Sequence, residues 1–405
     1  MNYKVLVLAV MGFVFVFDLL IHYLQTKSAK RPVPENVADV YDEQDYRTWL
    51  RYFGEKSRLS LWRHLVTSAA AFLLMGLNVY AWIHGVFYTE NIYTAACVTV
   101  IADILISQLW DIPFSYAGDM GIEQRYGFNR MTKGVFISDA IKNLLISGGL
   151  SCGLVCAMVG LHQGLGSWLV PAFTAVGLGF TLLMTFLSPM LTRIFNKLTP
   201  LEEGELREKL MQLLESNGCK VRNIYVMDGS KRSTKANAFF AGFGKTKTIA
   251  LYDTLIQQMT PDEIVAVFAH EMGHNKHKDT LKLTAINLVN FLMMGLFLWA
   301  LVSLPQLYTA FGFEGIHYGF AYVLLGVCLG ALNPLVQLLQ NALSRRFEYA
   351  ADAFAAENGY GDALITGLKK LEKANFGCLN PHPVLVKLYY SHPTTSQRIE
   401  RLTRR

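Results

Sequence analysis

Residues 260–304 read TPDEIVAVFAHEMGHNKHKDTLKLTAINLVNFLMMGLFLWALVSL, a charged segment that runs directly into a long apolar one. Thr260 and Glu263 have the spacing of a capping box, which predicts that a helix begins there. Ile264 and Phe268 continue the segment at helical spacing. The apolar stretch that follows is long enough to cross a lipid bilayer as a helix. The sequence therefore predicts a soluble helix that ends at a membrane surface.

Apolar blocks of similar length recur along the chain. Of its 405 residues, 52% are hydrophobic, and the mean hydropathy is +0.28. Seven spans are predicted, at residues 5–24, 64–87, 92–110, 136–161, 167–192, 281–304 and 318–338. We expect a mostly α, seven-helix polytopic membrane protein.

The net charge of +6 is explained by where the basic residues lie. Lys and Arg collect after spans 1, 3 and 5 and in the C-terminal tail, whereas residues 88–91, 162–166 and 305–317 contain neither. The positive-inside rule then places the N-terminus outside and the C-terminus in the cytosol. No nucleic-acid recognition motif accompanies the charge. We expect the lipid bilayer, and no nucleic acid, as a partner.

The spans divide the chain into four parts. Residues 1–192 would hold membrane helices 1–5 with their loops, 193–280 a cytosolic region with a small sheet and the helix that begins at Thr260, 281–338 membrane helices 6–7, and 339–405 a cytosolic C-terminal region. The two cytosolic regions are each small, so we expect them to pack together as one domain.

The cytosolic region 193–280 shows signals for both helix and sheet. A second capping box, Thr199 to Glu202, predicts a helix that runs to about Asn217. Short β-branched and aromatic runs at 223–227, 236–240 and 248–252 predict a small antiparallel sheet.

The segment His270-Glu271-Met272-Gly273-His274 matches the pattern H-E-x-x-H. On a helix, positions i and i+4 share one face, so both imidazoles can reach one zinc ion. Zinc lowers the pKa of a bound water toward about 7. The Glu271 carboxylate can take the water's proton and pass it to the leaving amine. Such a short pattern also arises by chance, but its place on a capped helix before a span favours the metal site.

A catalytic zinc ion needs a third protein ligand. Glu348 is the best candidate, because the last span is predicted to continue as a helix past the lipid. Asp352 lies one turn further on the same face, where it could hydrogen-bond a ligand histidine. The alternative is that Glu348 and Asp352 are simply charged side chains exposed to solvent. We assign His277 and Asp279 to the helix end or membrane surface.

Together these motifs resemble the integral-membrane CaaX prenyl protease family, the Ste24-type zinc metalloproteases. The resemblance rests on HEMGH at 270–274, SRRFEYAAD at 344–352 and the seven spans. EQRYGFN at 123–129, NAFF at 237–240, GFG at 242–244 and SHP at 391–393 agree with it. The resemblance covers nearly the whole chain.

The resemblance implies specific roles for the matching residues. The ligands of one zinc ion per chain would be His270, His274 and Glu348, with Glu271 as general base and Asp352 as the partner of a ligand. His392 would stabilise the oxyanion, although it could instead cap a loop. Asn237, Ala238 and Phe239 would form a strand edge that pairs with the substrate, although a buried strand is the alternative.

The resemblance also implies a fold and a substrate class. The fold would be seven helices around an intramembrane chamber, closed by a cytosolic gluzincin-like α+β zinc-protease domain. Polar residues in the spans, such as Asp103 and Asp111, fit a wet interior or helix-to-helix hydrogen bonds equally well. The substrate would be a peptide or protein, either a prenylated CaaX protein or a membrane protein under quality control.

Two other functions remain open. A site-2-type intramembrane protease also uses H-E-x-x-H, but it would carry the motif within a span. A non-catalytic membrane scaffold or chaperone with structural zinc would not require Glu271. The chain ends in RLTRR without an ER-retrieval tetrapeptide, so we expect a bacterial inner membrane, or the ER membrane if the source is eukaryotic.

Overall fold

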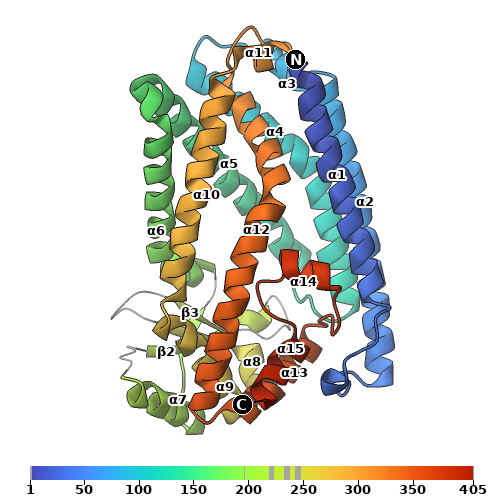
Figure 1. Cartoon of the computed structure of the whole chain (residues 1–405), viewed down its shortest axis with the longest axis vertical. Helices are drawn as coiled ribbons and strands as arrows, with labels where there is room; N and C mark the ends of the chain where they lie inside the picture. The colour runs from blue at the N-terminus through green and yellow to red at the C-terminus, as the bar shows by residue number, and fades with distance from the viewer. Residues whose placement is uncertain (1, 196, 219–222, 232–237, 242–247, 405) are drawn as a thin grey trace.

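The computed structural model describes residues 2–195, 197–218, 223–231, 238–241 and 248–404, and long helices dominate it (Figure 1). The predicted spans overlap α1 (Tyr3–Ser28), α2 (Glu43–Gly76), α4 (Ile92–Tyr116), α5 (Lys133–Leu165), α6 (Leu169–Phe195), α10 (Asp279–Val302) and α12 (Tyr318–Glu357). Among the described residues, six helices are long and apolar enough to cross a membrane, and α6 contains a shorter apolar stretch, Leu169–Met184. The predicted fold class is confirmed.

The second predicted span, 64–87, is divided in the structure. Helix α2 ends at Gly76, and Asn78 adopts the left-handed conformation (φ 57°) before α3 (Val79–Val86) begins. Asparagine tolerates this conformation better than most residues. Lys4 Nζ donates hydrogen bonds to Gly76 O (2.7 Å) and Asn78 Oδ1 (2.9 Å). A side chain from the start of α1 therefore stabilises this turn.

The soluble end contains short helices and one sheet. Its elements are β1 (Leu198–Pro200), α7 (Glu205–Ser216), β2 (Asn223–Met227), β3 (Ala238–Ala241), β4 (Thr248–Tyr252), α8 (Asp253–Gln258), α9 (Pro261–Lys276), α13 (Gly361–Ala374), α14 (Pro383–Tyr389) and α15 (Thr395–Thr403). The strand order is β1-β2-β4-β3. Strands β2 and β4 are parallel, whereas the other two pairs are antiparallel. The prediction of an all-antiparallel sheet is wrong because β3 lies between β2 and β4 in sequence and allows a parallel crossover.

The predicted helix start at Thr199 is also wrong. Residues 198–200 pair with β2, and the Leu201 amide donates to Ile224 O (2.9 Å). Helix α7 begins only at Glu205, after Gly204 with φ 153°. Pairing with a strand distant in sequence has overridden the local capping pattern.

The capping box that begins α9 is confirmed. Thr260 Oγ1 accepts from the Glu263 amide, and the Glu263 carboxylate accepts from the Thr260 amide. Lys370 Nζ of α13 also donates to Glu263 Oε2 (2.7 Å). The apolar face of α9, including Phe268, is buried against α7 and α13. Helix α9 is therefore the central helix of the soluble core.

Helices α9 and α12 approach each other closely at Gly273. A Cβ atom on Gly273 would lie 2.8 Å from Ala351 Cα, which is too short for any real contact. Glycine is therefore required here by the helix packing. The close approach brings the last turns of α9 against the part of α12 that extends beyond the membrane bundle (Figure 1).

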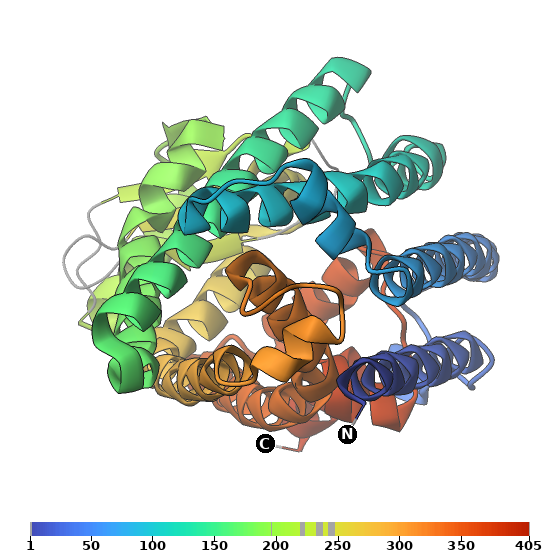
Figure 2. The ribbon, with the colours of Figure 1, turned by 90° about the horizontal axis from the view of Figure 1, so that it is seen from above.

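Two adjoining cavities lie within the bundle, where the resemblance placed a chamber. Seen from above, α1 and α2 (blue) lie on one side of the bundle and α6 (green) on the other (Figure 2). A cavity of about 550 Å³ is lined mainly by α1, α2 and α12. A cavity of about 970 Å³ lies between α5, α6 and α10. Both are lined by Leu154 and Met294, and all seven predicted spans contribute to one or the other.

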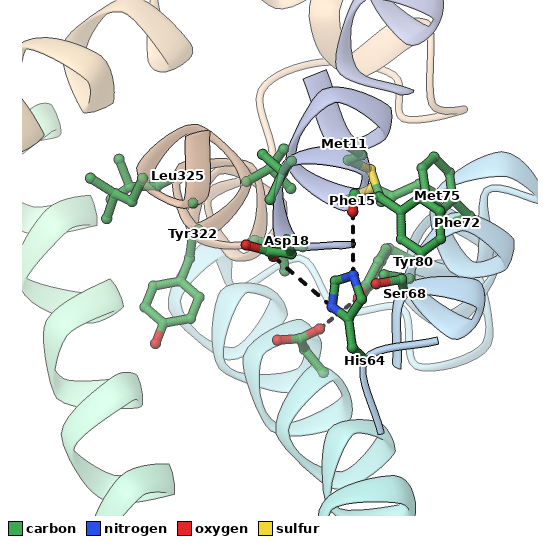
Figure 3. Close-up of a pocket in the computed structure, with 18 of the residues that line it drawn as sticks. Met11, Phe15, Asp18, His64, Ser68, Phe72, Met75, Tyr80, Tyr322 and Leu325 are labelled. Carbon is green, nitrogen blue, oxygen red and sulfur yellow. Dashed lines mark hydrogen bonds and ion pairs between the residues drawn. The ribbon is translucent and has the colours of Figure 1, made fainter. Parts of the chain in front are cut away.

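The two cavities differ in polarity. Around the smaller one, the His64 ring lies between Asp18 Oδ2 (4.0 Å) and Phe15 O (3.4 Å), as Figure 3 shows. Tyr80 donates to Asp103 Oδ1 (2.6 Å) in the same cavity. The larger cavity is lined mostly by glycine, phenylalanine, leucine and methionine. Asp111 links α4 to Arg63 of α2 (2.6 Å), so Asp103 and Asp111 both make contacts between helices.

Gly273→Ala should destabilise the soluble end. The added methyl group forces α9 and α12 apart, and overpacking of this kind costs about 1–3 kcal/mol. The free energy of unfolding in detergent measures the effect. Gly54→Ala on α2 is the control, because its Cβ meets nothing within 4 Å and alanine favours a helix. Equal stability of the Gly273→Ala variant and the wild type would contradict the packing argument.

Candidate active site

Three predicted ligands converge where α9 meets α12. His270 Nε2 lies 3.2 Å from His274 Nε2 and 3.4 Å from Glu348 Oε2, and His274 Nε2 lies 3.2 Å from Glu348 Oε1. Two ligand atoms about 2.0–2.1 Å from one tetrahedral zinc ion are separated by about 3.3 Å. Glu348 Oε2 is buried and has no hydrogen-bond partner among the described residues. The donor set and its spacing fit one metal ion.

Each histidine turns its other ring nitrogen toward a carboxylate. His270 Nδ1 lies 2.8 Å from Asp352 Oδ1, and His274 Nδ1 lies 3.0 Å from Asp279 Oδ2. A carboxylate in this position fixes the imidazole so that Nε2 faces the metal. The structure thus places Asp352 beside His270 and Asp279 beside His274. Asp279 is the first residue of α10, so it lies at a helix end as predicted, but it is only 3% exposed and faces His274.

Arg398 of α15 is a further buried group that the sequence analysis missed. Its Nε donates to Asp352 Oδ2 (2.9 Å) and its Nη2 donates to Asp352 Oδ1 (2.5 Å), so the two side chains form a bidentate salt bridge. Nη1 also lies 3.6 Å from Glu348 Oε2. Among the described residues, Asp352 is therefore held between His270 and a buried cation. One sequence signal could have indicated that Arg398 is buried: it lies on a capped helix beside the apolar residues Ile399 and Leu402.

Glu271 and His392 lie at the edge of this group. Glu271 is on α9 between the two histidines and is only partly buried. His392 Nε2 lies 3.2 Å from Glu348 Oε1, while Nδ1 lies 2.8 Å from Ser391 Oγ. The His392 side chain is 60% exposed. The side of the centre next to His392 is therefore open to a reactant.

The predicted substrate strand is only partly described. Asn237 lies outside the described residues. Ala238 and Phe239 belong to β3, which pairs with β4 and is the last strand of the sheet. Strand β3 also contacts α9. Within the described part of the chain, one edge of β3 is left unpaired beside the helix that carries the histidines.

The charged groups shift each other's protonation. Burial alone would lower the pKa of His274, but the carboxylates of Glu348 and Asp279 outweigh it and raise the pKa to about 9. Burial alone would raise the pKa of Glu348, but His270 and His274 hold it well below its usual range. The histidines therefore hold protons tightly where a metal would bind, and metal binding would release those protons.

A helical membrane bundle that carries an H-E-x-x-H helix and a converging glutamate defines an integral-membrane metalloendopeptidase. Comparison with known proteins gives the family. The model for peptidase family M48 matches residues 200–405, and the model for the CAAX prenyl protease N-terminal region, five membrane helices, matches residues 22–197. The chain belongs to peptidase family M48.

Named relatives match over almost the full length. A CAAX prenyl protease 1 homolog of Oryza sativa subsp. japonica is 33% identical, over 98% of this chain and 96% of the relative. CAAX prenyl protease 1 of Saccharomyces cerevisiae is 28% identical, over 96% and 92%. The crystal structure of S. mikatae Ste24p has a TM-score of 0.93 at 24% identity and covers 99% of both chains, which shows the shared fold.

Asp352→Asn should strongly destabilise the metal-free protein. The change removes the hydrogen-bonded charge partner of buried Arg398 and leaves only Glu348 at 3.6 Å, and breaking a buried ion pair costs about 3–5 kcal/mol. Adding Arg398→Met to this variant should restore part of the loss. Unfolding free energies measured in detergent with a chelator give both values.

Asp39→Asn is the matched control. Asp39 pairs with Lys369 (2.7 Å) but is 66% exposed, so this loss should stay below about 1 kcal/mol. A similar cost for the two aspartates would show that burial of the Arg398 pair contributes little.

Proposed function

We propose that this protein is a zinc endopeptidase that cleaves membrane-associated polypeptides on the cytosolic side. The convergence of His270 Nε2, His274 Nε2 and the Glu348 carboxylate at zinc-ligand spacing carries the proposal. These three residues would hold one zinc ion per chain, and Asp352 would orient His270. Zinc would supply polarisation of a water molecule and of the scissile carbonyl.

The surrounding residues would handle the proton and the developing charge. Glu271 takes the proton from the attacking water and delivers it to the leaving amine. His392 donates a hydrogen bond to the carbonyl oxygen as negative charge develops there. The exposed position of His392 beside Glu348 supports this role, because the substrate carbonyl must fit between the ring and the ligands.

We propose that the substrate binds as an added strand. The segment Asn237 to Phe239 would pair with an extended peptide through its backbone groups, which gives affinity with little sequence preference. The end position of β3 in the sheet and its contact with α9 support this role. The peptide would then run past the histidines.

The relatives are named CAAX prenyl proteases, which supports membrane-associated substrates for this chain. We propose prenylated CaaX proteins or, in a bacterial source, membrane proteins under quality control. The compartment would be the bacterial inner membrane, or the ER membrane in a eukaryote.

Charge placement supports a cytosolic active site. The N-terminus, α3 and α11 (Pro305–Thr309) lie at one end of the molecule, and α9, α13 and the C-terminus lie at the other (Figure 1). The connections 88–91 and 305–317, at the first end, contain no Lys or Arg. The positive-inside rule places that end outside.

The site-2-type alternative fits the structure less well. Helix α9 ends at Lys276, and the span-forming helix α10 starts separately at Asp279. The histidines therefore precede the span, whereas a site-2-type protease would carry them within it. The scaffold alternative differs from the protease in one requirement: a scaffold with structural zinc does not need the Glu271 carboxylate, whereas the protease does.

Glu271→Gln should retain about one zinc per chain and lose hydrolysis by at least about 10²–10⁴-fold, because the amide cannot accept the proton. Metal analysis and peptide cleavage measure the two effects. Glu215→Gln, at an exposed position on α7, is the control. Unchanged cleavage by Glu271→Gln would reject the mechanism and favour the scaffold alternative.

A chelator should abolish cleavage, and zinc should restore it. Assays on a farnesylated peptide and its unmodified form then test the substrate class. A lower KM for the farnesylated peptide is expected if the lipid contributes to binding. Equal KM values would favour quality control of unmodified membrane proteins.

A further inference from the structure

Two polar residues of α12 bind the end of α14. Arg345 Nη1 donates to Val386 O (2.9 Å), Tyr390 O (2.8 Å) and Lys387 O (3.3 Å). Asn341 Nδ2 donates to Leu388 O (2.6 Å). We call Asn341 and Arg345 the α14 clamp. Arg345 belongs to the motif at residues 344–352, but the proposed mechanism, which uses the metal ligands and Glu271, assigns no role to Arg345.

The clamp supplies hydrogen bonds that α14 cannot make alone. Helix α14 contains only seven residues, and the last four carbonyls of any helix lack intrahelical partners. The guanidinium cation also faces the negative end of the helix dipole. Because a helix this short is marginal by itself, we infer that contacts with α12 maintain its end.

The residues after α14 lead directly to the active site. Tyr390 O is bound by Arg345, and His392 follows two residues later. On α12, Glu348 follows Arg345 by about one turn on the same face. One rigid helix therefore carries a proposed metal ligand and fixes the loop that brings His392 within 3.2 Å of that ligand.

His392 has few other restraints. Its side chain is 60% exposed, and its described polar contacts are to Ser391 and Glu348. An exposed side chain on a loop cannot hold a fixed direction unless its backbone is held.

We propose that Arg345, supported by Asn341, is a positioning residue that sets His392 against the metal centre. The proposal rests on the oxyanion role given to His392 under the proposed function. Arg345 acts through the backbone of residues 386–390 and does not touch the substrate.

Arg345→Met is the main test, because methionine keeps an apolar stem but cannot donate. A misplacement of about 1 Å can cost about 10²-fold in rate. We expect kcat to fall by about that factor, with KM and zinc content unchanged. Arg346→Met is the matched control, since Arg346 is the next residue on the same helix and is exposed. Arg345→Lys should recover part of kcat, because a single ammonium reaches fewer carbonyls.

A double variant separates positioning from a general loss of structure. If Arg345 acts through His392, Arg345→Met combined with His392→Ala should be no slower than His392→Ala alone. Hydrogen exchange adds a readout independent of activity: amides of residues 384–392 should exchange faster in Arg345→Met and at the wild-type rate in Arg346→Met.

Wild-type kcat in Arg345→Met, or losses that multiply in the double variant, would overturn the proposal. If Arg345→Met loses its metal or fails to fold, Asn341→Leu carries the same test with a smaller expected loss. His392→Ala with unchanged kcat would instead reject the role of His392 in the proposed function. Exchange rates would then still report whether the clamp holds α14.

Discussion

The close approach of α9 and α12 at Gly273 and Ala351 is the constraint on which the rest of the site depends. His270 and His274 come from α9, and Glu348 comes from α12, so the spacing of their ligand atoms is set by the distance between the two helices. A metal ion tolerates only a few tenths of an ångström in that spacing. Glycine at position 273 lets the backbones come near enough. Metal binding by His270, His274 and Glu348 therefore requires this contact between the two helices.

Burial of charge explains why distant parts of the chain meet here. Asp279, Glu348 and Asp352 are each no more than 3% exposed, and moving a charge out of water costs several kcal/mol unless a partner compensates it. Arg398 compensates Asp352, and Lys282 donates to Asp279 (2.9 Å). The charged residues of the site thus come from four helices, α9, α10, α12 and α15. Its electrostatic balance is complete only when the C-terminal helix is docked.

Local patterns allowed the sequence to predict much of this arrangement. The capping box at Thr260, the i, i+4 histidines and the apolar spans each encode their structure within a few residues. Contacts between distant segments were harder to predict: β1 pairs with β2 instead of starting a helix, and Arg398 reaches Asp352 from another element. The contact of Asp279 with His274 was not predicted, because an aspartate at the start of a span ordinarily faces the lipid surface. In each case the deciding partner was far away in sequence.

Helix α12 also fixes the distance between the smaller membrane cavity and the group formed by His270, His274 and Glu348. Gly330 lines the smaller cavity, and Glu348 lies further along the same helix by about 27 Å at 1.5 Å per residue. An extended chain covers about 3.3 Å per residue, so about eight residues are needed to connect the two places. A substrate that occupied both would place its scissile bond and its membrane-embedded portion in separate environments. Under the proposed function, the smaller cavity would hold the anchored part of such a substrate, and the metal-binding residues would act on a segment about eight residues away.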